Sequence, residues 1–349
     1  MLFDQDYKRA LEALDNQLKT HPGVAIYWLQ KGLYLRELKQ QHESLEALNE
    51  SLNINPYNQE TYKFKGITLT DLGNYSEAIQ NFDKCLEIMP DYAEVWRLRG
   101  CALYDTGKYE EALSNLNKSL EINPADARSL ECNGAVLIKL NRSKEALEYL
   151  NKSLNLEPRQ PGTWYWKAIA LSVSGADAEA LENINKSLKM DPRNKSAWWV
   201  KGIILRRLKN YRQELRVWTK LAHLTQKDED IIIQQGITLA NLRAYAESLN
   251  KFDLVLKRNS NNAEAWRLRG IILFKLRVWN AAISSMDTSL QINPRNYDAW
   301  ITKANTLYGL RRYAESMYAF ERALKINPDD LKIAELISTI RSYLREREY

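Results

Sequence analysis

Along most of the chain, apolar and small residues recur in a fixed order that fits one face of a helix. An aromatic residue comes first, and a small residue follows four positions later, as in Trp96 and Gly100. Residues four apart share a face of an α-helix, so the small residue, here called the notch residue, lets a neighbouring helix approach. The aromatic positions are Trp28, Tyr62, Trp96, Trp164, Trp198, Trp266 and Trp300, with Leu130 and Ile232 as substitutes. The notch residues are Gly32, Gly66, Gly100, Gly134, Gly202, Gly236 and Gly270, with Ala168 and Ala304.

The second half of each unit carries its own helical pattern after a short break. A second small residue comes twelve positions after the notch, as at Ala112, and a bulky residue follows it, as at Leu116. Such spacing on both sides of a break predicts two antiparallel helices, a first and a second helix in each unit. Glycines at Gly73, Gly107 and Gly175 stand where the first helix must end in a left-handed cap. Isolated helices of this length are marginal in water, so stability must come from stacking one pair on the next.

Prolines mark the end of each unit with a period of 34 residues. They stand at Pro22, Pro56, Pro90, Pro124, Pro158, Pro192, Pro294 and Pro328. The same register predicts prolines at 226 and 260, where the sequence has Gln226 and Ser260. Proline biases the preceding residue away from helix, so each of these prolines ends a second helix. A fixed period without insertions indicates one small unit that is copied and stacked.

These positions resemble the tetratricopeptide repeat. In one unit the residues that carry the resemblance are Trp96, Gly100, Tyr109, Ala112, Leu116 and Pro124, and the match covers residues 25–330. The resemblance implies an all-α, right-handed α-solenoid of antiparallel helix pairs, with nine full 34-residue units. Residues 1–24 are predicted to be the second helix of a partial N-terminal repeat. Residues 331–349 are predicted to be a C-terminal capping helix. Its apolar face covers the open end of the stack, and its polar face is exposed to water.

One position departs from the family pattern. Just before the notch, where relatives usually carry an apolar side chain, stand Lys31, Lys65, Arg99, Lys167, Lys201, Arg269 and Lys303. We expect their stems to cover apolar surface while their charges reach water or a neighbouring carboxylate. A ligand-binding basic ladder is the alternative.

Composition adds an uneven charge distribution. The formal net charge is +6, yet residues 1–194 carry 23 Lys and Arg against 28 Asp and Glu, and residues 195–349 carry 27 against 16. The C-terminal half is therefore the better surface for an acidic partner. The amino terminus has no basic segment followed by an apolar run, as a signal peptide would. No stretch approaches the ~18 apolar residues of a membrane-spanning helix. The three cysteines lack the close pairing in sequence that is typical of disulfide-bonded proteins. These features predict a cytoplasmic protein that does not associate with membranes.

No catalytic arrangement is visible. The three histidines stand alone in different units, and no glycine-rich phosphate loop occurs. We therefore expect no enzymatic activity, no metal and no cofactor. Glycosylation sequons at Asn117, Asn151 and Asn185 fall in the middle of predicted second helices and are dismissed. Cys101 and Cys132 are expected to approach each other on the inner surface, by preference as two small apolar residues, with a redox switch as the alternative.

In the tetratricopeptide family, the concave wall made by the first helices often binds an extended or helical segment of a partner. The residue after the notch normally faces this groove and is often polar in relatives. Here it is apolar in all units but the last: Leu33, Ile67, Cys101, Ala135, Ile169, Ile203, Ile237 and Ile271, then Asn305. Basic residues frame this floor, and they are Lys63, Arg97, Arg206, Arg207, Arg267 and Lys275.

We predict that an amphipathic helix or an apolar peptide of a protein partner lies in this groove. The alternative is that the same side chains pack between neighbouring first helices. The predicted contact residues are Phe64, Ile67, Arg97, Tyr165, Trp166, Ile169, Trp199, Ile203, Arg206, Ile233, Ile237, Arg267 and Ile271. The lysine–asparagine pair of chaperone-binding relatives is absent, because Lys63 is followed four residues later by Ile67 and Arg97 by Cys101.

A second set of residues supports an alternative function. The predicted polyanion edge consists of Arg207, Lys209, Arg243, Lys275, Arg277, Arg311 and Arg312, at or near the turns between helices in the last units. It would bind nucleic acid or another polyanion. We favour a simpler interpretation, in which cations in the last turn of a helix stabilise its dipole.

Between Arg212 and Asn262 the pattern is irregular. Glu214 replaces the usual small alanine, and Trp218 replaces a smaller bulky residue. A hinge, a change of pitch to suit a partner and sequence drift all remain open. The sequence thus predicts a non-enzymatic scaffold or adaptor for protein segments, with nucleic acid as the less favoured partner and no prediction of oligomeric state.

Overall fold

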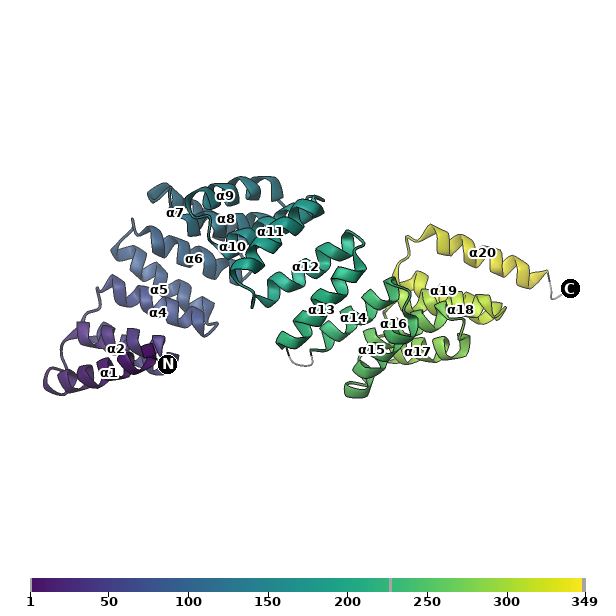
Figure 1. Ribbon diagram of the computed structural model, residues 1–349, viewed down its shortest axis with the longest axis horizontal. Coiled ribbons are helices and arrows are strands. Elements are labelled where there is room, and N and C mark those ends of the chain that lie inside the picture. Colours follow the sequence, from purple (N-terminus) through teal and green to yellow (C-terminus); the bar gives the residue numbers. More distant parts are fainter. Residues whose placement is uncertain (1, 226–227, 347–349) are drawn as a thin grey trace. The chain divides into compact units, whose positions relative to one another are not determined.

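The computed structural model describes residues 2–225 and 228–346, and its regular structure is helical (Figure 1). Within these residues there are 20 α-helices and no strand. Gln226, where the register predicted a proline, lies outside the described residues. The chain divides into two compact units, residues 1–192 and 193–349.

The first unit begins with α1 (Leu2–Thr20) and continues as helix pairs. The first helices are α2 (Ala25–Glu37), α4 (Gln59–Asp71), α6 (Ala93–Asp105), α8 (Ala127–Lys139) and α10 (Pro161–Val173). The second helices are α3 (Gln41–Ile54), α5 (Tyr75–Ile88), α7 (Tyr109–Ile122), α9 (Ser143–Leu156) and α11 (Asp177–Met190). Each second helix packs on its own first helix, and consecutive first helices from α2 to α10 also touch each other.

The second unit repeats this arrangement. Its first helices are α12 (Lys195–Arg207), α14 (Glu229–Asn241), α16 (Ala263–Lys275) and α18 (Tyr297–Gly309). Its second helices are α13 (Tyr211–Thr225), α15 (Tyr245–Arg258), α17 (Trp279–Ile292) and α19 (Tyr313–Ile326), followed by α20 (Leu331–Arg345). α20 packs on α19 and buries Ile337 and Ile340. The boundaries predicted at residues 24 and 330 stay predictions.

Within a pair, the notch residue receives the bulky side chain of the second helix. A Cβ added to Gly100 would lie 2.9 Å from Cγ of Leu116, and one added to Gly66 would lie 2.4 Å from Cε1 of Phe82. Phe82 and Leu116 are at most 1% exposed. The prediction that the notch admits a neighbouring helix is confirmed, and the neighbour is the second helix of the same unit.

Tryptophan side chains connect five of the first helices, α2, α6, α10, α16 and α18, to the loop before each of them. The indole N–H donates to a backbone carbonyl six residues earlier. The pairs are Trp28–Pro22, Trp96–Pro90, Trp164–Pro158, Trp266–Ser260 and Trp300–Pro294, at 2.7–2.9 Å. Because the acceptor is a backbone atom, the missing proline at Ser260 does not remove the bond. We did not predict this contact, although the constant spacing between proline and aromatic was visible in the sequence.

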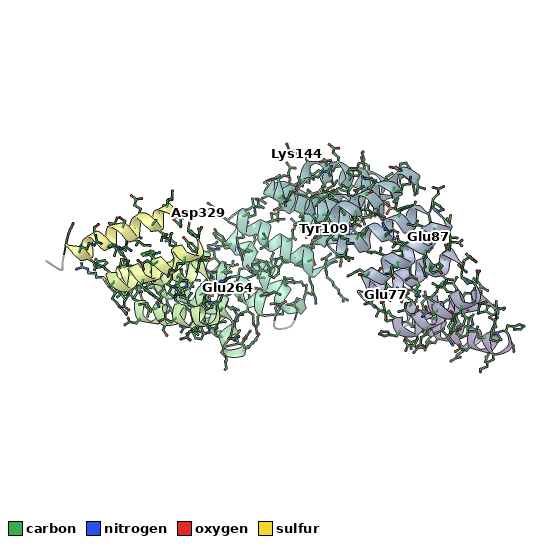
Figure 2. All side chains as sticks on the ribbon, turned by 180° about the vertical axis from the view of Figure 1, so that it is seen from behind. Glu77, Glu87, Tyr109, Lys144, Glu264 and Asp329 are labelled. Carbon is green, nitrogen blue, oxygen red and sulfur yellow. The ribbon has the colours of Figure 1, made fainter. Side chains whose placement is uncertain are left out.

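Serines in the second helices form a further set of buried bonds. Ser119, Ser153 and Ser187 have no exposed surface. Each hydroxyl donates to the carbonyl of the first residue of the first helix in its pair, at 2.8–2.9 Å. These serines belong to the three sequons that we dismissed, and in the structure they take part in packing within a helix pair. By contrast, charged residues of the second helices such as Glu77 and Lys144 are exposed (Figure 2).

The cations before the notch behave as expected wherever a carboxylate lies 16 residues earlier. The ion pairs are Lys31–Asp15, Arg99–Asp83, Arg269–Asp253 and Lys303–Asp287, at 2.5–2.7 Å. Three of these cations also lie 5.4–5.6 Å from the ring centre of the tryptophan three residues earlier. The expectation that these charges reach neighbouring carboxylates is confirmed for these four, so they form part of the stack and not a free ladder.

The turns between first and second helices use left-handed backbone. Gly73, Gly107 and Gly175 have φ between +79° and +83°, which confirms the predicted caps. The equivalent residues of other pairs are Lys39, Asn141, Lys209, Arg243, Arg277 and Arg311, with φ between +56° and +64°. A side chain in this region costs about 1–2 kcal/mol relative to the right-handed conformation.

Replacing Arg277 with glycine is therefore expected to raise the free energy of unfolding by about 0.5–1 kcal/mol. Glycine removes the left-handed strain, and its larger loss of backbone entropy on folding cancels part of the gain. The midpoint of urea-induced unfolding measures the effect. Arg277→Ala is the matched control, because it removes the charge but keeps the strained Cβ. An equal gain in both variants would show that strain is not the cause.

Candidate functional site

The residues that follow the notch form the floor of the predicted groove, and most of them are partly exposed. Partly exposed are Leu33, Ile67, Cys101, Ile169, Ile203, Ile237 and Ile271, whereas Ala135 is buried and Asn305 is exposed. Five of them also pack against the buried core of their unit: Ile67, Ile169, Ile203, Ile237 and Ile271. The two interpretations of these residues are therefore compatible, because the same side chains pack between helices and still present apolar surface.

The aromatic residues of the predicted contact set lie beside this floor. Phe64, Tyr165 and Trp166 in the first unit and Trp199 in the second are partly exposed. Ile233 differs, because it is 6% exposed and packs in the core around Phe252. It leaves little surface for a partner.

An aromatic cluster and a cavity lie beside the first helices α6, α8 and α10 of the first unit. The Trp166 ring lies edge-on to Tyr165, with centroids 5.0 Å apart, and to Tyr104, with centroids 6.3 Å apart. A cavity of about 120 Å³ is lined by Cys101, Tyr104, Asp105, Leu116, Cys132, Ala135, Val136 and Trp166. We did not predict Tyr104 or Asp105, although both lie one helical turn after Cys101, on the same face.

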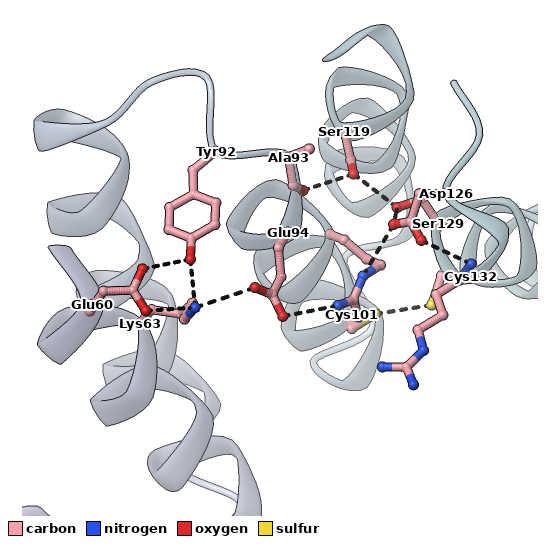
Figure 3. A network of polar contacts seen from close by, with 12 residues as sticks. Glu60, Lys63, Tyr92, Ala93, Glu94, Cys101, Ser119, Asp126, Ser129 and Cys132 are labelled. Carbon is pink, nitrogen blue, oxygen red and sulfur yellow. Dashed lines mark hydrogen bonds and ion pairs between the residues drawn. The ribbon is translucent and has the colours of Figure 1, made fainter. Parts of the chain in front are cut away.

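Lys63 was expected among the basic residues that frame the groove. It is 7% exposed, and its Nζ lies 2.8 Å from Glu60, 3.3 Å from Glu94 and 2.5 Å from the Tyr92 hydroxyl (Figure 3). Burial alone would lower the pKa of Lys63, but its bonds to Glu60 and Tyr92 raise the pKa above its usual value. Lys63 therefore stays charged, and the carboxylates of Glu60 and Glu94 balance its charge.

Arg97 continues the same network towards the next helix pair. Its guanidinium lies 3.6 Å from Glu94 and 3.4 Å from Asp126. Asp126 is the N-cap residue of α8 and accepts a hydrogen bond from the Ser129 hydroxyl at 2.5 Å. Figure 3 shows the resulting chain of contacts from α4 through α6 to α8. The network ties three successive first helices together.

Two predicted contact arginines of the second unit are paired in a similar way. Arg267 donates two hydrogen bonds to the Glu264 carboxylate, at 2.6 and 2.7 Å. Arg206 donates to Glu214 at 2.7 Å through Nε, and Glu214 is fully buried. Arg97, Arg206 and Arg267 thus already have carboxylate partners, which leaves apolar and aromatic side chains as the available contact surface.

The irregular unit contains a compensated pair of substitutions. Glu214 Oε1 accepts hydrogen bonds from the Trp218 indole at 3.0 Å and from the Thr238 hydroxyl at 2.8 Å. Trp218 is fully buried and fills the notch at Gly202. Glu214 stands where other units have alanine, and it therefore provides the hydrogen-bond acceptor that the buried indole N–H of Trp218 needs.

The residues of the predicted polyanion edge lie at the turns of the second unit. Arg207, Lys209, Arg243, Lys275, Arg277, Arg311 and Arg312 are all exposed. Arg312 donates two hydrogen bonds to Glu315, at 2.6 and 2.7 Å, and Lys275 lies 6.0 Å from the ring centre of Tyr245. A role of this edge in polyanion binding stays a prediction.

Among residues 2–225 and 228–346, no group of three or more His, Cys, Asp or Glu side chains is placed to hold a metal ion. In the same part of the chain, the helices are all too short or too polar to cross a bilayer.

Comparisons with known proteins identify the repeat. Sequence models of the tetratricopeptide repeat match residues 25–58, 59–125, 134–160 and 297–330. No curated protein matches the chain. Several hundred solved chains share its fold.

Three of these structures show the extent of the likeness. A tetratricopeptide repeat protein from Parabacteroides merdae aligns with a TM-score of 0.55 at 16% identity, over 71% of this chain and 98% of that one. Pseudomonas aeruginosa PilF aligns with a TM-score of 0.53 at 19% identity, over 62% and 96%. A chain of the APC/C hetero-tetramer Cut9–Hcn1 aligns with a TM-score of 0.54 at 19% identity, over 90% of this chain but only 63% of that one. Helix pairs, notch residues and sequence models agree, and the chain is a tetratricopeptide-repeat protein.

Proposed function

We propose that this protein is a non-enzymatic scaffold that holds an amphipathic helix or apolar peptide of a partner protein against its first helices. The tetratricopeptide-repeat fold supports a role in protein interaction. One observation carries the finer proposal: partly exposed apolar side chains recur at the same position of successive first helices. They include Ile67 and Ile169 in the first unit and Ile203, Ile237 and Ile271 in the second.

The pairing of the nearby cations favours an apolar contact over an ionic one. Arg97 and Arg267 are bound by carboxylates of this chain. A partner that relied on its own carboxylates would have to break these pairs, whereas a partner with an apolar face would not. Burial of apolar surface contributes about 25 cal/mol per Å², and aromatic side chains supply much of the energy at interfaces. We propose that the partner binds mainly through such burial.

Charge substitutions on the groove floor test the proposal. Ile237→Lys and Ile271→Lys, both in the second unit, are expected to weaken binding by about tenfold or more, since each puts a charge where the partner's apolar face would lie. The ligand is a fluorescent peptide selected from a random phage-displayed library on the immobilised full-length chain, and its affinity is measured by fluorescence anisotropy. Selected peptides are expected to carry apolar residues three to four positions apart.

Ile88→Lys and Leu254→Lys are the matched controls, because both residues are exposed on second helices. Circular dichroism reports whether each variant keeps its helices. If the four variants bind the peptide equally, the floor is not the contact surface. A peptide affinity that falls steeply with salt, together with salt-sensitive binding of poly(A) RNA, would favour the polyanion edge.

A cytoplasmic location is part of this proposal. Cys85, Cys101 and Cys132 are free thiols, as is usual for a protein in a reducing compartment.

A further inference from the structure

Two cysteines from neighbouring repeats of the first unit face each other across the first helices α6 and α8. The Sγ atoms of Cys101 on α6 and Cys132 on α8 lie 3.1 Å apart (Figure 3). A disulfide bond is about 2.05 Å long, so a side-chain movement of about 1 Å would join them. α6 and α8 are adjacent first helices in direct contact. The sequence predicted that these residues approach each other but favoured simple packing.

The surroundings of the two sulfurs suit a small reagent. Both cysteines are partly exposed, and both line the cavity of about 120 Å³ beside Tyr104, Asp105 and Trp166. A cysteine that served only to fill space in the core would not need to line a cavity. An oxidant of the size of hydrogen peroxide can therefore reach the sulfurs without unfolding the repeat.

The two thiols differ in character. Hydrogen bonding between the two thiols lowers the pKa of Cys101 against the effect of its burial, and the charge of Arg97 acts in the same direction. The same hydrogen bond and burial raise the pKa of Cys132. The thiolate is the reactive form of cysteine, so the attack falls to Cys101, which lies one helical turn after Arg97 on α6, and the resolving step to Cys132.

We propose that Cys101 and Cys132 are a redox-active pair that a hydroperoxide converts into a disulfide between α6 and α8. In the first step, the Cys101 thiolate attacks one oxygen of hydrogen peroxide. The O–O bond breaks, Cys101 becomes a sulfenic acid, and the released hydroxide takes a proton to become water. Cys132 then attacks the Cys101 sulfur, the S–O bond breaks, and a second water leaves with the proton of Cys132.

Two thiols and one peroxide thus yield one disulfide and two waters, with two electrons passing from sulfur to oxygen. The product links the first helices of two successive pairs. The inference rests on the facing sulfurs and on the cavity beside them, and it does not depend on the proposed partner groove.

Cys85 provides an internal control. It is fully buried, and its thiol donates to the carbonyl of Gln59 at 3.2 Å. Burial raises the pKa of Cys85 to about 11. It is expected to stay reduced under conditions that oxidise the pair.

The test treats the reduced full-length chain with micromolar hydrogen peroxide, alkylates the remaining thiols in denaturant and maps the peptides by mass spectrometry without reduction. We expect loss of two thiols, a peptide linked through Cys101 and Cys132, and recovery of both thiols with dithiothreitol. Cys101→Ser is expected to slow thiol oxidation roughly tenfold. Cys132→Ser is expected to leave a sulfenic acid on Cys101 that dimedone traps.

Cys85→Ser is the matched control and is expected to form the cross-link at the wild-type rate. Circular dichroism verifies that each variant is folded. The proposal is overturned if the native chain keeps all three thiols, or if the cross-link appears only after unfolding in urea. It is also overturned if Cys85 reacts as fast as Cys101.

Discussion

Replacing Glu214 with alanine is expected to lower the free energy of unfolding by about 2–4 kcal/mol. This holds even though alanine is the usual residue at this position, as at Ala112. Glu214 is fully buried, and its Oε1 accepts from the Trp218 indole and the Thr238 hydroxyl. Alanine would leave the indole N–H buried without an acceptor. Urea-induced unfolding followed by circular dichroism measures the loss, and amide hydrogen exchange should place it in α12–α14.

A second substitution should recover much of this loss. Glu214→Ala combined with Trp218→Leu recreates the pairing of Ala112 with Leu116, which needs no buried acceptor. The double variant is therefore expected to be more stable than the sum of the two single losses predicts. If the unfolding free-energy losses of the two single variants simply add up in the double variant, the hydrogen bond between the indole and the carboxylate is not the reason for a glutamate at position 214.

Replacing Gly202 with alanine is expected to cost about 2 kcal/mol, although alanine is the better helix former by about 1 kcal/mol. The added Cβ would lie 2.4 Å from Cζ2 and 2.5 Å from Cη2 of Trp218. The indole cannot easily move aside, because it is fully buried and its N–H is bound to Glu214. The thermal unfolding midpoint of the full-length variant measures this cost.

Gly309→Ala is the control for helix propensity, since a Cβ at Gly309 meets no atom within 4 Å. It is expected to keep or raise the stability of the chain. Trp218→Ile should rescue Gly202→Ala, because the equivalent positions of the first unit hold Ala168 and Ile184, which are both fully buried. A Gly202→Ala variant as stable as Gly309→Ala would contradict the close packing at the notch.

The helical fold was predictable because its signal is local and repeated. The spacing of Trp96 and Gly100 fixes one helix face, and the positive φ of Gly107 ends that helix at the predicted place. The same periodicity placed Ile169 and Trp166 on the first helices, where the structure has them. Residue positions along a helix follow from the 3.6-residue turn alone, so no knowledge of neighbours was needed.

The state of individual side chains was decided only by the tertiary structure. Lys63 and Arg97 were expected at the rim of a groove, yet Glu94 and Asp126 from the following repeats already bind them. Sequence spacing does not reveal which carboxylate reaches which cation, because that depends on rotamers and on how one helix sits against the next. The sequence likewise predicted only that Cys101 and Cys132 approach each other. The 3.1 Å between their sulfurs and the cavity beside them follow from the packing of α6 against α8.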